Sequence, residues 1–277
     1  MKNKICIVTG ATSGMGLATA VSLAGMGATI GLVCRNKAKG EKVVNNIKEK
    51  THNTKVELFI ADLSSIKEIR RVAEEIKKVY PRIDVLVNNA GAINKERIVT
   101  IDSYETTFAV NHLAYFYLTN LLLNNLKSAP SARIVSVASQ AGMIGRINFK
   151  DIHLAKKYSS IKAYAQSKLA NIMFTYELAR KLEGSNVRAN CLHPGGVRTN
   201  FGKDLNGLFG FVFQKMGGLL RTAEKGAETI IWLVSSDEAE GLSGKYLKDK
   251  KEIRSNKISY DIEQQQRLWE LSKKLCS

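Results

Sequence analysis

Proline and cysteine are both scarce in this 277-residue sequence. Only three prolines occur and no Pro-, Gly- or Ser-rich linker divides the chain, so we expect a single domain over residues 1–277. The four cysteines (Cys6, Cys34, Cys191 and Cys276) show neither a CxxC motif nor histidine-paired metal spacing. Three of them lie in apolar, strand-like runs, as small core residues do. The cysteines therefore indicate no metal site and favour a reducing, cytoplasmic location.

Long hydrophobic runs are missing as well. The first apolar run, 5–8, starts close to the initiator methionine and leads directly into a glycine turn, which we expect to leave no room for a signal peptide. No stretch reaches the roughly 18 uninterrupted apolar residues of a transmembrane helix. The most apolar late segment, 201–220, is interrupted by Lys203, Asp204 and Lys215. We therefore expect no segment that spans a membrane.

Acidic residues are few relative to basic ones, and the net charge is +17. Such an excess suits nucleic acid, an anionic membrane surface or an acidic substrate. The basic residues are spread along segments such as 37–50 and 66–78, where they mix with glutamate, which is also typical of solvated helix faces. No recognition motif with interleaved aromatic residues supports nucleic-acid binding. We expect no nucleic-acid partner, and peripheral contact with a membrane stays open.

Short β-branched runs alternate with longer helical patterns along the whole chain. The strand candidates are 4–9, 28–34, 55–60, 84–88, 132–138, 186–192 and 244–248. The helical patterns fall near 14–26, 37–50, 64–79, 102–127, 158–183, 222–235 and 260–275. This alternation predicts an α/β fold, with a Rossmann-like, doubly wound parallel sheet of about seven strands and helices on both faces. Ligands of such sheets bind beyond the carboxyl ends of the strands, so residues just after each strand are the candidates for chemistry.

A glycine-rich turn follows the first strand. Residues 9–16 read TGATSGMG and open directly into the first helical pattern. Glycines allow the backbone to turn sharply and approach a pyrophosphate, which then rests on the amide groups at the helix start. A purely structural turn is the alternative, since glycine clusters are common. The candidate cofactor contacts in this turn are Gly10, Thr12, Ser13, Gly14, Met15 and Gly16.

The end of the second strand lacks the acidic residue that an NAD-binding domain places on the ribose 2′-hydroxyl. The sequence there reads Val33-Cys34-Arg35-Asn36, and Arg35 offers a guanidinium to a 2′-phosphate. A strand-end arginine that simply faces water is the alternative. Arg35 and Asn36 therefore favour NADP(H) as the cofactor.

A tyrosine and a lysine stand four residues apart on the 158–183 helix. This spacing places Tyr164 and Lys168 on one helix face. A tyrosine with its ordinary pKa near 10 is a poor proton donor and acceptor at neutral pH. A neighbouring ammonium favours the phenolate, and lowering the pKa by about 3 units needs roughly 4 kcal/mol. We therefore expect Lys168, together with the oxidised nicotinamide, to lower the Tyr164 pKa. The pair alone is a weak signal.

Three further polar positions strengthen this prediction. Ser139 follows the 132–138 strand, where its hydroxyl could hold a substrate oxygen. Asn88-Asn89-Ala90-Gly91 forms a polar turn after the fourth strand. Asn111 lies inside a helical pattern, an unfavourable place for asparagine unless its side chain has a task, such as holding a water that links Lys168 to solvent. The alternatives are an exposed helical asparagine and an ordinary strand-end hydroxyl.

Together these motifs resemble the short-chain dehydrogenase/reductase family along essentially the whole chain. The resemblance implies a catalytic tetrad of Asn111, Ser139, Tyr164 and Lys168. It also implies cofactor contacts beyond the glycine turn and the second strand, at Asp62, Leu63, Asn89, Ala90, Gly91, Tyr164, Lys168, Pro194, Gly195, Val197 and Thr199. Within the family, the chain is most similar to the retinol-dehydrogenase-like group. Two departures from many of these proteins are expected to matter: we expect no membrane-anchoring segment before the first strand, and Val137-Ala138-Ser139 replaces the usual VSS.

The resemblance implies an NADP(H)-dependent oxidoreductase that moves hydride between the nicotinamide and a carbonyl or alcohol. The apolar segment at about 200–222 should form a lid over a large apolar substrate, such as a retinoid or long-chain aldehyde, or else an ordinary packed connection. A reductase of 3-oxoacyl, steroid or other ketone substrates is the next alternative, and a non-catalytic NADP(H)-sensing protein stays open. By family analogy, the helix at 108–126 and the helix after Tyr158 are dimer surfaces, which suggests a homodimer or homotetramer.

Overall fold

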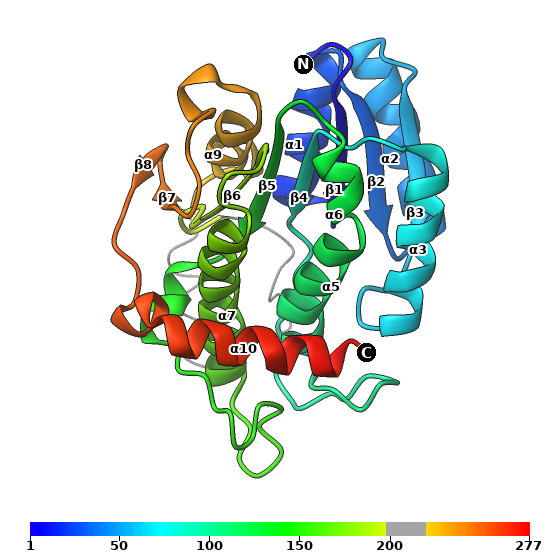
Figure 1. Cartoon of the computed structure of the whole chain (residues 1–277). Helices are drawn as coiled ribbons and strands as arrows, with labels where there is room; N and C mark the ends of the chain where they lie inside the picture. Colours follow the sequence, from blue (N-terminus) through cyan, green and yellow to red (C-terminus); the bar gives the residue numbers. More distant parts are fainter. Residues whose placement is uncertain (198–219) are drawn as a thin grey trace.

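Eight strands form one sheet in the computed structural model, which describes residues 1–197 and 220–277 (Figure 1). The strand order is β3-β2-β1-β4-β5-β6-β7-β8, and every neighbouring pair is parallel except β7 and β8. The strands are β1 Ile5–Thr9, β2 Thr29–Cys34, β3 Val56–Ile60, β4 Val85–Asn88, β5 Ala132–Val137, β6 Val187–Leu192, β7 Tyr246–Lys248 and β8 Lys251–Glu252. The doubly wound α/β fold is confirmed, with one strand more than expected. That strand, β8, has only two residues and pairs with β7 across a tight turn, so it left no apolar pattern in the sequence.

Helices cover both faces of the sheet. Within residues 1–197 and 220–277, the α-helices of six or more residues are α1 Gly14–Gly25, α2 Lys37–Thr51, α3 Ile66–Val79, α5 Ala114–Leu121, α7 Ser160–Lys181, α9 Ala223–Ser235 and α10 Ile262–Leu275. Buried residues of α1, α2 and α9 share one core cluster, and those of α3, α5 and α7 share the other. Each expected strand, and each expected helix apart from the one at 102–127, lies within two residues of its observed ends.

The central strands are apolar throughout because both of their faces are buried. On β1, Ile7 belongs to the core cluster under α3, α5 and α7, whereas Cys6 and Val8 belong to the cluster under α1, α2 and α9. All three side chains are 0% exposed. Alternate side chains of a strand point to opposite faces, so a strand with a core on each side needs apolar residues at every position.

The expected single helix at 102–127 is wrong. The segment divides into the short helix α4 (Thr106–Phe108), a π-helical turn (Ala109–Leu113), α5, and α6 (Leu123–Lys127). The Glu105 carboxylate accepts hydrogen bonds from the backbone N–H groups of Thr107 and Phe108, which fixes where the first of these elements begins. A π-helical turn is rare and is frequent at functional sites, and this one contains Asn111. Helical periodicity in the sequence does not distinguish a π turn from an α turn.

The C-terminal helix α10 packs across α5 and α7 (Figure 1). Its Trp269 ring lies edge-on to Phe116 of α5, with centroids 4.9 Å apart, and stacks on Phe174 of α7 at 5.8 Å. These two helices are the ones that the family analogy assigned to a dimer surface. Part of that surface is therefore covered by the chain's own C-terminal helix.

Candidate active site

The glycine turn between β1 and α1 brings backbone amides to the carboxyl edge of the sheet. Gly10 and Gly14 have φ angles of 65° and 56°, which glycine adopts without strain. A side chain at Gly10 would lie 2.7 Å from Cα of Ala90, so only glycine fits there. Ser13 caps α1 without a side-chain hydrogen bond, and the first turn of α1 holds no acidic residue. The first amides of α1 are thus available to an anion, and the turn fits a nucleotide phosphate.

The polar turn after β4 is hydrogen-bonded to the end of β1. The Thr9 hydroxyl accepts hydrogen bonds from the backbone N–H of Asn89 (2.9 Å) and Ala90 (3.1 Å) and donates one to the carbonyl of Val87. The Asn89 side chain donates to the Thr9 carbonyl at 2.9 Å. Asn89 and Ala90, both predicted cofactor contacts, therefore lie directly beside the glycine turn, and Gly91 is exposed immediately after them.

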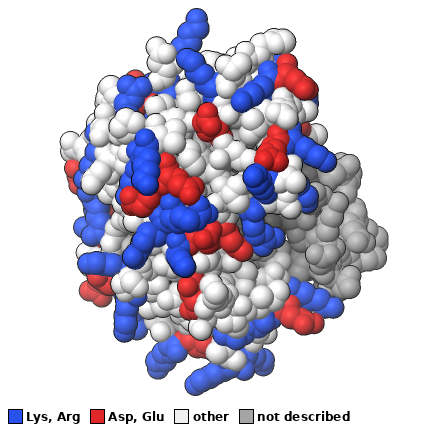
Figure 2. Space-filling view, turned by 90° about the vertical axis from the view of Figure 1, so that its right-hand side faces the viewer, with Lys and Arg blue, Asp and Glu red and all other residues white. Residues whose placement is uncertain are grey.

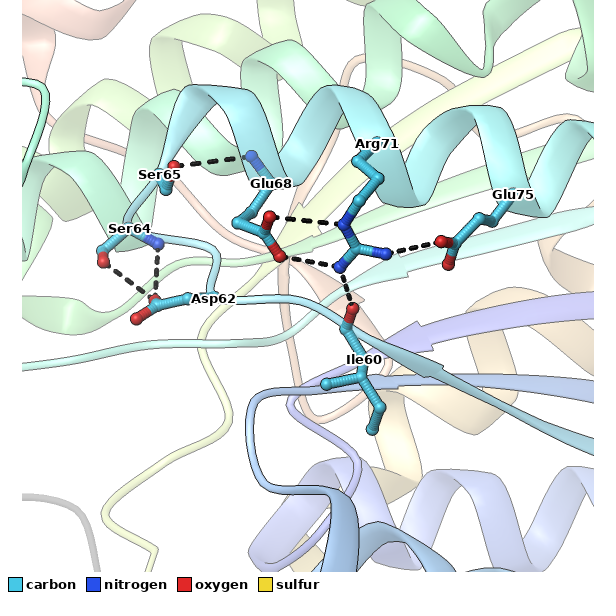
Figure 3. A network of polar contacts seen from close by, with 7 residues as sticks. All are labelled: Ile60, Asp62, Ser64, Ser65, Glu68, Arg71 and Glu75. Carbon is cyan, nitrogen blue, oxygen red and sulfur yellow. Dashed lines mark hydrogen bonds and ion pairs between the residues drawn. The ribbon is translucent and has the colours of Figure 1, made fainter.

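The ends of β2 and β3 carry the residues predicted to recognise the adenosine half of the cofactor. Arg35 is exposed after β2, and the Asn36 side chain accepts the Lys39 N–H to cap α2. After β3, the Asp62 carboxylate accepts hydrogen bonds from the N–H and the hydroxyl of Ser64, at 2.9 and 2.8 Å (Figure 3). Leu63 is buried. These side chains are held at the carboxyl edge of the sheet, and their role toward a cofactor stays a prediction.

A separate ion-pair network holds the end of β3 against α3. The Arg71 guanidinium contacts the carboxylates of Glu68 and Glu75 and donates a hydrogen bond to the Ile60 carbonyl (Figure 3). This arginine acts within the scaffold and does not reach toward the glycine turn. Its effect is to fix the strand end that precedes Asp62.

The predicted catalytic side chains of β5 and α7 lie together. Lys168 is only 3% exposed, and its ammonium donates a 2.8 Å hydrogen bond to the carbonyl of Val137, the last residue of β5. The Lys168 nitrogen lies 5.7 Å from the centroid of the Tyr164 ring. Tyr164 and Ser139 are joined by a side-chain hydrogen bond, and Ser139 also accepts the Ala141 N–H. Ser139, Tyr164 and Lys168 therefore form one group at the carboxyl end of β5.

The protein's own groups do not by themselves lower the Tyr164 pKa, so the expected lowering by Lys168 and the oxidised nicotinamide together stays a prediction. Burial raises the pKa of Tyr164 to about 12, and the hydrogen bond from Ser139 offsets only part of this effect. Burial also lowers the pKa of Lys168 to about 7. The protein therefore keeps Tyr164 in the protonated form, which is the form that can donate a proton.

Asn111 joins the polar turn to the catalytic helix. Its side chain accepts the Ala92 N–H at 2.7 Å and donates to the Ala92 carbonyl and to the Ser167 hydroxyl, both at 3.0 Å. Ser167 in turn donates to the Tyr164 carbonyl at 2.8 Å. The side chain of Asn111 thus makes direct contacts with both segments, and the expected task of holding a water stays a prediction. The prediction from sequence missed Ser167, which carries no signal of its own there.

Tyr115 is a second residue that the prediction from sequence missed. Its hydroxyl donates a 2.7 Å hydrogen bond to the Ala90 carbonyl, and its ring centroid lies 5.7 Å from the Lys168 nitrogen. The Lys168 nitrogen therefore lies equally close to two tyrosine rings, those of Tyr115 and Tyr164. A signal was present in the sequence, because Tyr115 stands four residues after Asn111 and both contact the turn at 90–92.

The loop after β6 approaches the start of α1. Gly195 has a φ of 86°, and a side chain there would collide with that of Arg221, which is ion-paired with Asp249. Val197 and Met15 both pack close to Gly226 of α9, which places this loop beside the glycine turn. Pro194 is buried just before Gly195. Thr199 and nearly all of the predicted lid at about 200–222 lie outside the described residues.

Comparison with known proteins decides the family. The family described as short chain dehydrogenase matches residues 4–207. The chain belongs to the short-chain dehydrogenase/reductase family. Retinol dehydrogenase 14 of Homo sapiens is 40% identical over 98% of this chain and 86% of its own length. Polyprenol dehydrogenase of Homo sapiens is 39% identical over 98% of this chain and 84% of its own length.

Solved structures of short-chain dehydrogenases show the same fold. An uncharacterized protein from Mycobacterium paratuberculosis has a TM-score of 0.81 and 33% identity, with 99% of this chain and 94% of that chain covered. A short chain dehydrogenase from Shigella flexneri complexed with NADP has a TM-score of 0.70 and 26% identity, with 89% of this chain and 96% of that chain covered. The chain is thus a member of the retinol-dehydrogenase-like group, an oxidoreductase that acts on CH–OH and C=O groups with a nicotinamide cofactor.

Proposed function

We propose that this oxidoreductase uses NADP(H) and interconverts a carbonyl and an alcohol on a large apolar substrate, such as a retinoid or a long-chain aldehyde. The observation that carries the proposal is the group of Ser139, Tyr164 and Lys168 at the carboxyl end of β5, beside the glycine turn. A bound nicotinamide supplies or accepts hydride in this chemistry. The chain itself must deliver a proton to the substrate oxygen and hold the substrate in a fixed orientation.

Each residue of this group has a distinct task in the proposed reaction. In the reducing direction, Tyr164 donates its phenolic proton to the substrate oxygen as negative charge develops there. When substrate is bound, the Ser139 hydroxyl donates its one proton to that oxygen instead of to Tyr164, as the second hydrogen bond there. Lys168 adds positive charge close to Tyr164 and stabilises the phenolate that remains. Asn111 acts one step away, since it holds the backbone of Tyr164 through Ser167.

The choice of NADP(H) over NAD(H) rests on the end of β2. Arg35 is exposed there, and no acidic residue stands within 33–36 to bind a ribose 2′-hydroxyl. An arginine binds phosphate in a bidentate manner and retains its charge at any physiological pH. The complex of the Shigella flexneri relative with NADP supports the same choice.

The proposed substrate class rests on the relatives and on the side chains around the catalytic group. The relatives include proteins named for retinol and for polyprenol. Met143 and Ile144, shortly after Ser139, and Ile161, three residues before Tyr164, are exposed apolar side chains. A substrate with an apolar tail would bury them, whereas a small polar substrate would leave them in water. A 3-oxoacyl or steroid substrate is the alternative within the same chemistry.

The decisive experiment follows absorbance of the reduced cofactor with NADPH and NADH in parallel, against retinal, long-chain aldehydes, ketosteroids and 3-oxoacyl esters. We expect turnover with NADPH on an apolar aldehyde. Tyr164→Phe should lower kcat at least about 100-fold, because a positioned proton donor contributes about that much, and should leave the Kd for NADPH within a few fold. Near-normal turnover by Tyr164→Phe would exclude the assigned role. Tight NADPH binding with no turnover on any substrate would favour the NADP(H)-sensing alternative.

A further inference from the structure

Exposed apolar side chains gather at one end of the molecule. Ten large apolar residues are exposed within residues 1–197 and 220–277, and six of them follow β4 or β5 at the carboxyl edge of the sheet. The six are Ile98, Val99, Ile101, Met143, Ile144 and Ile161. The most exposed are Ile101 at 87% and Ile144 at 73%. Single exposed apolar residues need no explanation, but a group on neighbouring loops indicates an interaction surface.

The same end carries a local excess of positive charge. Between residues 145 and 162 the sequence contains five basic residues and one acidic residue, Asp151. The basic residues are Arg146, Lys150, Lys156, Lys157 and Lys162, all exposed, and none forms an ion pair with an acidic side chain in the described ranges. Asp151 is used internally, since its carboxylate accepts the N–H groups of Ala155 and Lys156. This contact folds the loop so that Lys156 and Lys157 stand next to each other in water.

Hydrogen bonds hold these segments together. Arg97 donates a hydrogen bond to the His153 carbonyl, and Tyr158 donates one to the Asn94 carbonyl, which joins the loop after β4 to the loop before α7. On the other side of that loop, a side chain at Gly145 would lie 2.5 Å from the Ala165 carbonyl, one helical turn after Ile161. Ile144 and Ile161 therefore stand on two segments that pack together along the first turns of α7. We call the exposed apolar and basic side chains of residues 98–101 and 143–162 the rim surface.

The rim surface lies at the end of the molecule where substrate must enter. The strands run toward the lower part of Figure 1, and the loop before α7 projects beyond the helices at that end. Ser139 directly precedes the 3₁₀ turn with Met143 and Ile144, and Tyr164 is in the first turns of α7.

The charge pattern on the side of α2 and α3 differs from that of the rim surface. Figure 2 shows Lys and Arg interspersed with Asp and Glu on that side of the molecule. On α3, for example, Arg71 is paired with both Glu68 and Glu75. Basic residues of this kind are partly neutralised by their neighbours and have little attraction left for an anionic surface. The rim surface, where unpaired lysines stand beside exposed isoleucines, has both components that peripheral membrane binding requires.

We propose that the rim surface docks the enzyme on an anionic phospholipid bilayer, with the 145–162 loop lying at the headgroups and the flanking isoleucines entering the interface. An isolated apolar side chain or a few lysines bind a bilayer only weakly, but the two contributions add. Docking in this orientation turns the end of the molecule that carries Ser139 and Tyr164 toward the lipid. An apolar substrate dissolved in the bilayer would then reach the site without passing through water. This consequence rests on the proposed function.

The test is co-sedimentation of the full chain with large unilamellar vesicles, without cofactor or substrate. Vesicles of phosphatidylcholine alone are compared with vesicles that contain phosphatidylserine, at 0.05 and 0.3 M salt concentrations (on the order of the range over which charge screening changes). We expect at least about ten-fold tighter binding to the anionic vesicles, and weaker binding at the higher salt concentration. Equal or absent binding to the two kinds of vesicle would overturn the proposal.

Matched variants identify the surface. Each basic residue near an anionic membrane contributes about five-fold to binding, so Lys156→Glu/Lys157→Glu should reduce the partition constant by at least about 25-fold. Lys50→Glu/Lys55→Glu introduces the same charge change on exposed residues at the opposite edge of the sheet and should reduce it less than about three-fold. Ile101→Ser/Ile144→Ser tests the apolar contribution and should weaken binding several-fold. Equal losses in the two charge-reversal variants would show that net charge alone causes binding and would overturn the proposal.

Docking and catalysis can fail independently in these measurements. Tyr164→Phe should sediment with anionic vesicles as the wild type does, because it leaves the rim surface unchanged. Lys156→Glu/Lys157→Glu should retain wild-type NADPH affinity in solution and lose only binding to vesicles.

Discussion

The buried Lys168 makes the stability of this protein depend on pH. Its folded-state pKa is about 7, against an ordinary value of 10.5, because burial disfavours the charged ammonium. Between these two values the folded chain binds fewer protons than the unfolded chain, so stability rises with pH across this window. The free-energy cost of burying the Lys168 charge is fully present below pH 7, and it disappears above the ordinary lysine pKa of 10.5.

Lys168→Met should therefore stabilise the protein more at pH 7 than at pH 9. The slope for one proton is about 1.4 kcal/mol per pH unit, so we expect the difference between the two pH values to be on the order of 2 kcal/mol. Urea unfolding of both proteins at the two pH values measures it. Lys50→Met, which removes an exposed lysine, controls for the loss of one positive charge. The same gain in stability at both pH values would contradict the lowered pKa.

At the scale of single residues, the sequence predicted which side chains would meet but not their electrostatic state. Ser139, Tyr164 and Lys168 come together because each stands at a fixed place after a strand or on one helix face. The sequence did not predict that burial by itself raises the Tyr164 pKa, because burial comes from the whole fold. Tyr115 was missed although its spacing from Asn111 was visible, because a tyrosine in an apolar helix is indistinguishable from a core residue.

Among the secondary-structure elements, the segment 109–115 works as a clamp on the turn after β4. Asn111 bonds both backbone groups of Ala92, and Tyr115, one turn later, bonds the carbonyl of Ala90. Ala90 in turn lies against Gly10 of the cofactor turn. The clamp thus fixes the distance between the polar turn and the glycine turn from the side of α5.

Tyr115→Phe should loosen this clamp. The change removes the hydrogen bond to Ala90 and keeps the ring beside Lys168, so we expect a loss of about 1 kcal/mol in stability and about three- to ten-fold in NADPH affinity. Tyr117→Phe is the matched control, because its hydroxyl bonds Arg70 on α3, away from the site. A titration followed by NADPH fluorescence measures the NADPH affinity of both variants. Equal affinities in the two variants would exclude a role for Tyr115 in positioning the turn.

Elements with a strong sequence period were predicted well, and the exceptions share a physical cause. The parallel strands are apolar at every position because they are buried on both faces, and the helices between them have clear starts and ends. The π-helical turn at 109–113 was missed because its side chains follow a pattern that an α-helix would also show. β8 was missed because a two-residue strand is specified by the turn before it, where Asp249 and Lys250 have positive φ, and not by hydrophobic alternation.

At the scale of the whole molecule, α10 covers part of α5 and α7. The family analogy assigned α5 and α7 to a dimer surface, but Trp269 packs on both of them, and the Lys181 ammonium lies 5.0 Å above its ring. Ser272 on the same helix bonds the buried His112, with 2.8 Å between its hydroxyl oxygen and Nε2. A homodimer or homotetramer formed through α5 and α7 would therefore use only the part of those helices that α10 leaves uncovered.

This arrangement predicts that α10 is part of the core and not an appendage. Trp269→Ala should cost about 2 kcal/mol or more in the free energy of unfolding, somewhat below the value for a fully buried tryptophan because the ring is partly exposed. The variant should also self-associate at high concentration, since Phe116 and Phe174 lose their cover. Urea unfolding and light scattering measure the two effects, with Glu270→Ala, on the exposed side of the same helix, as the control. If both variants unfold at the same urea concentration, α10 contributes little to the core and the helices beneath it would be free to form the dimer that the analogy suggests.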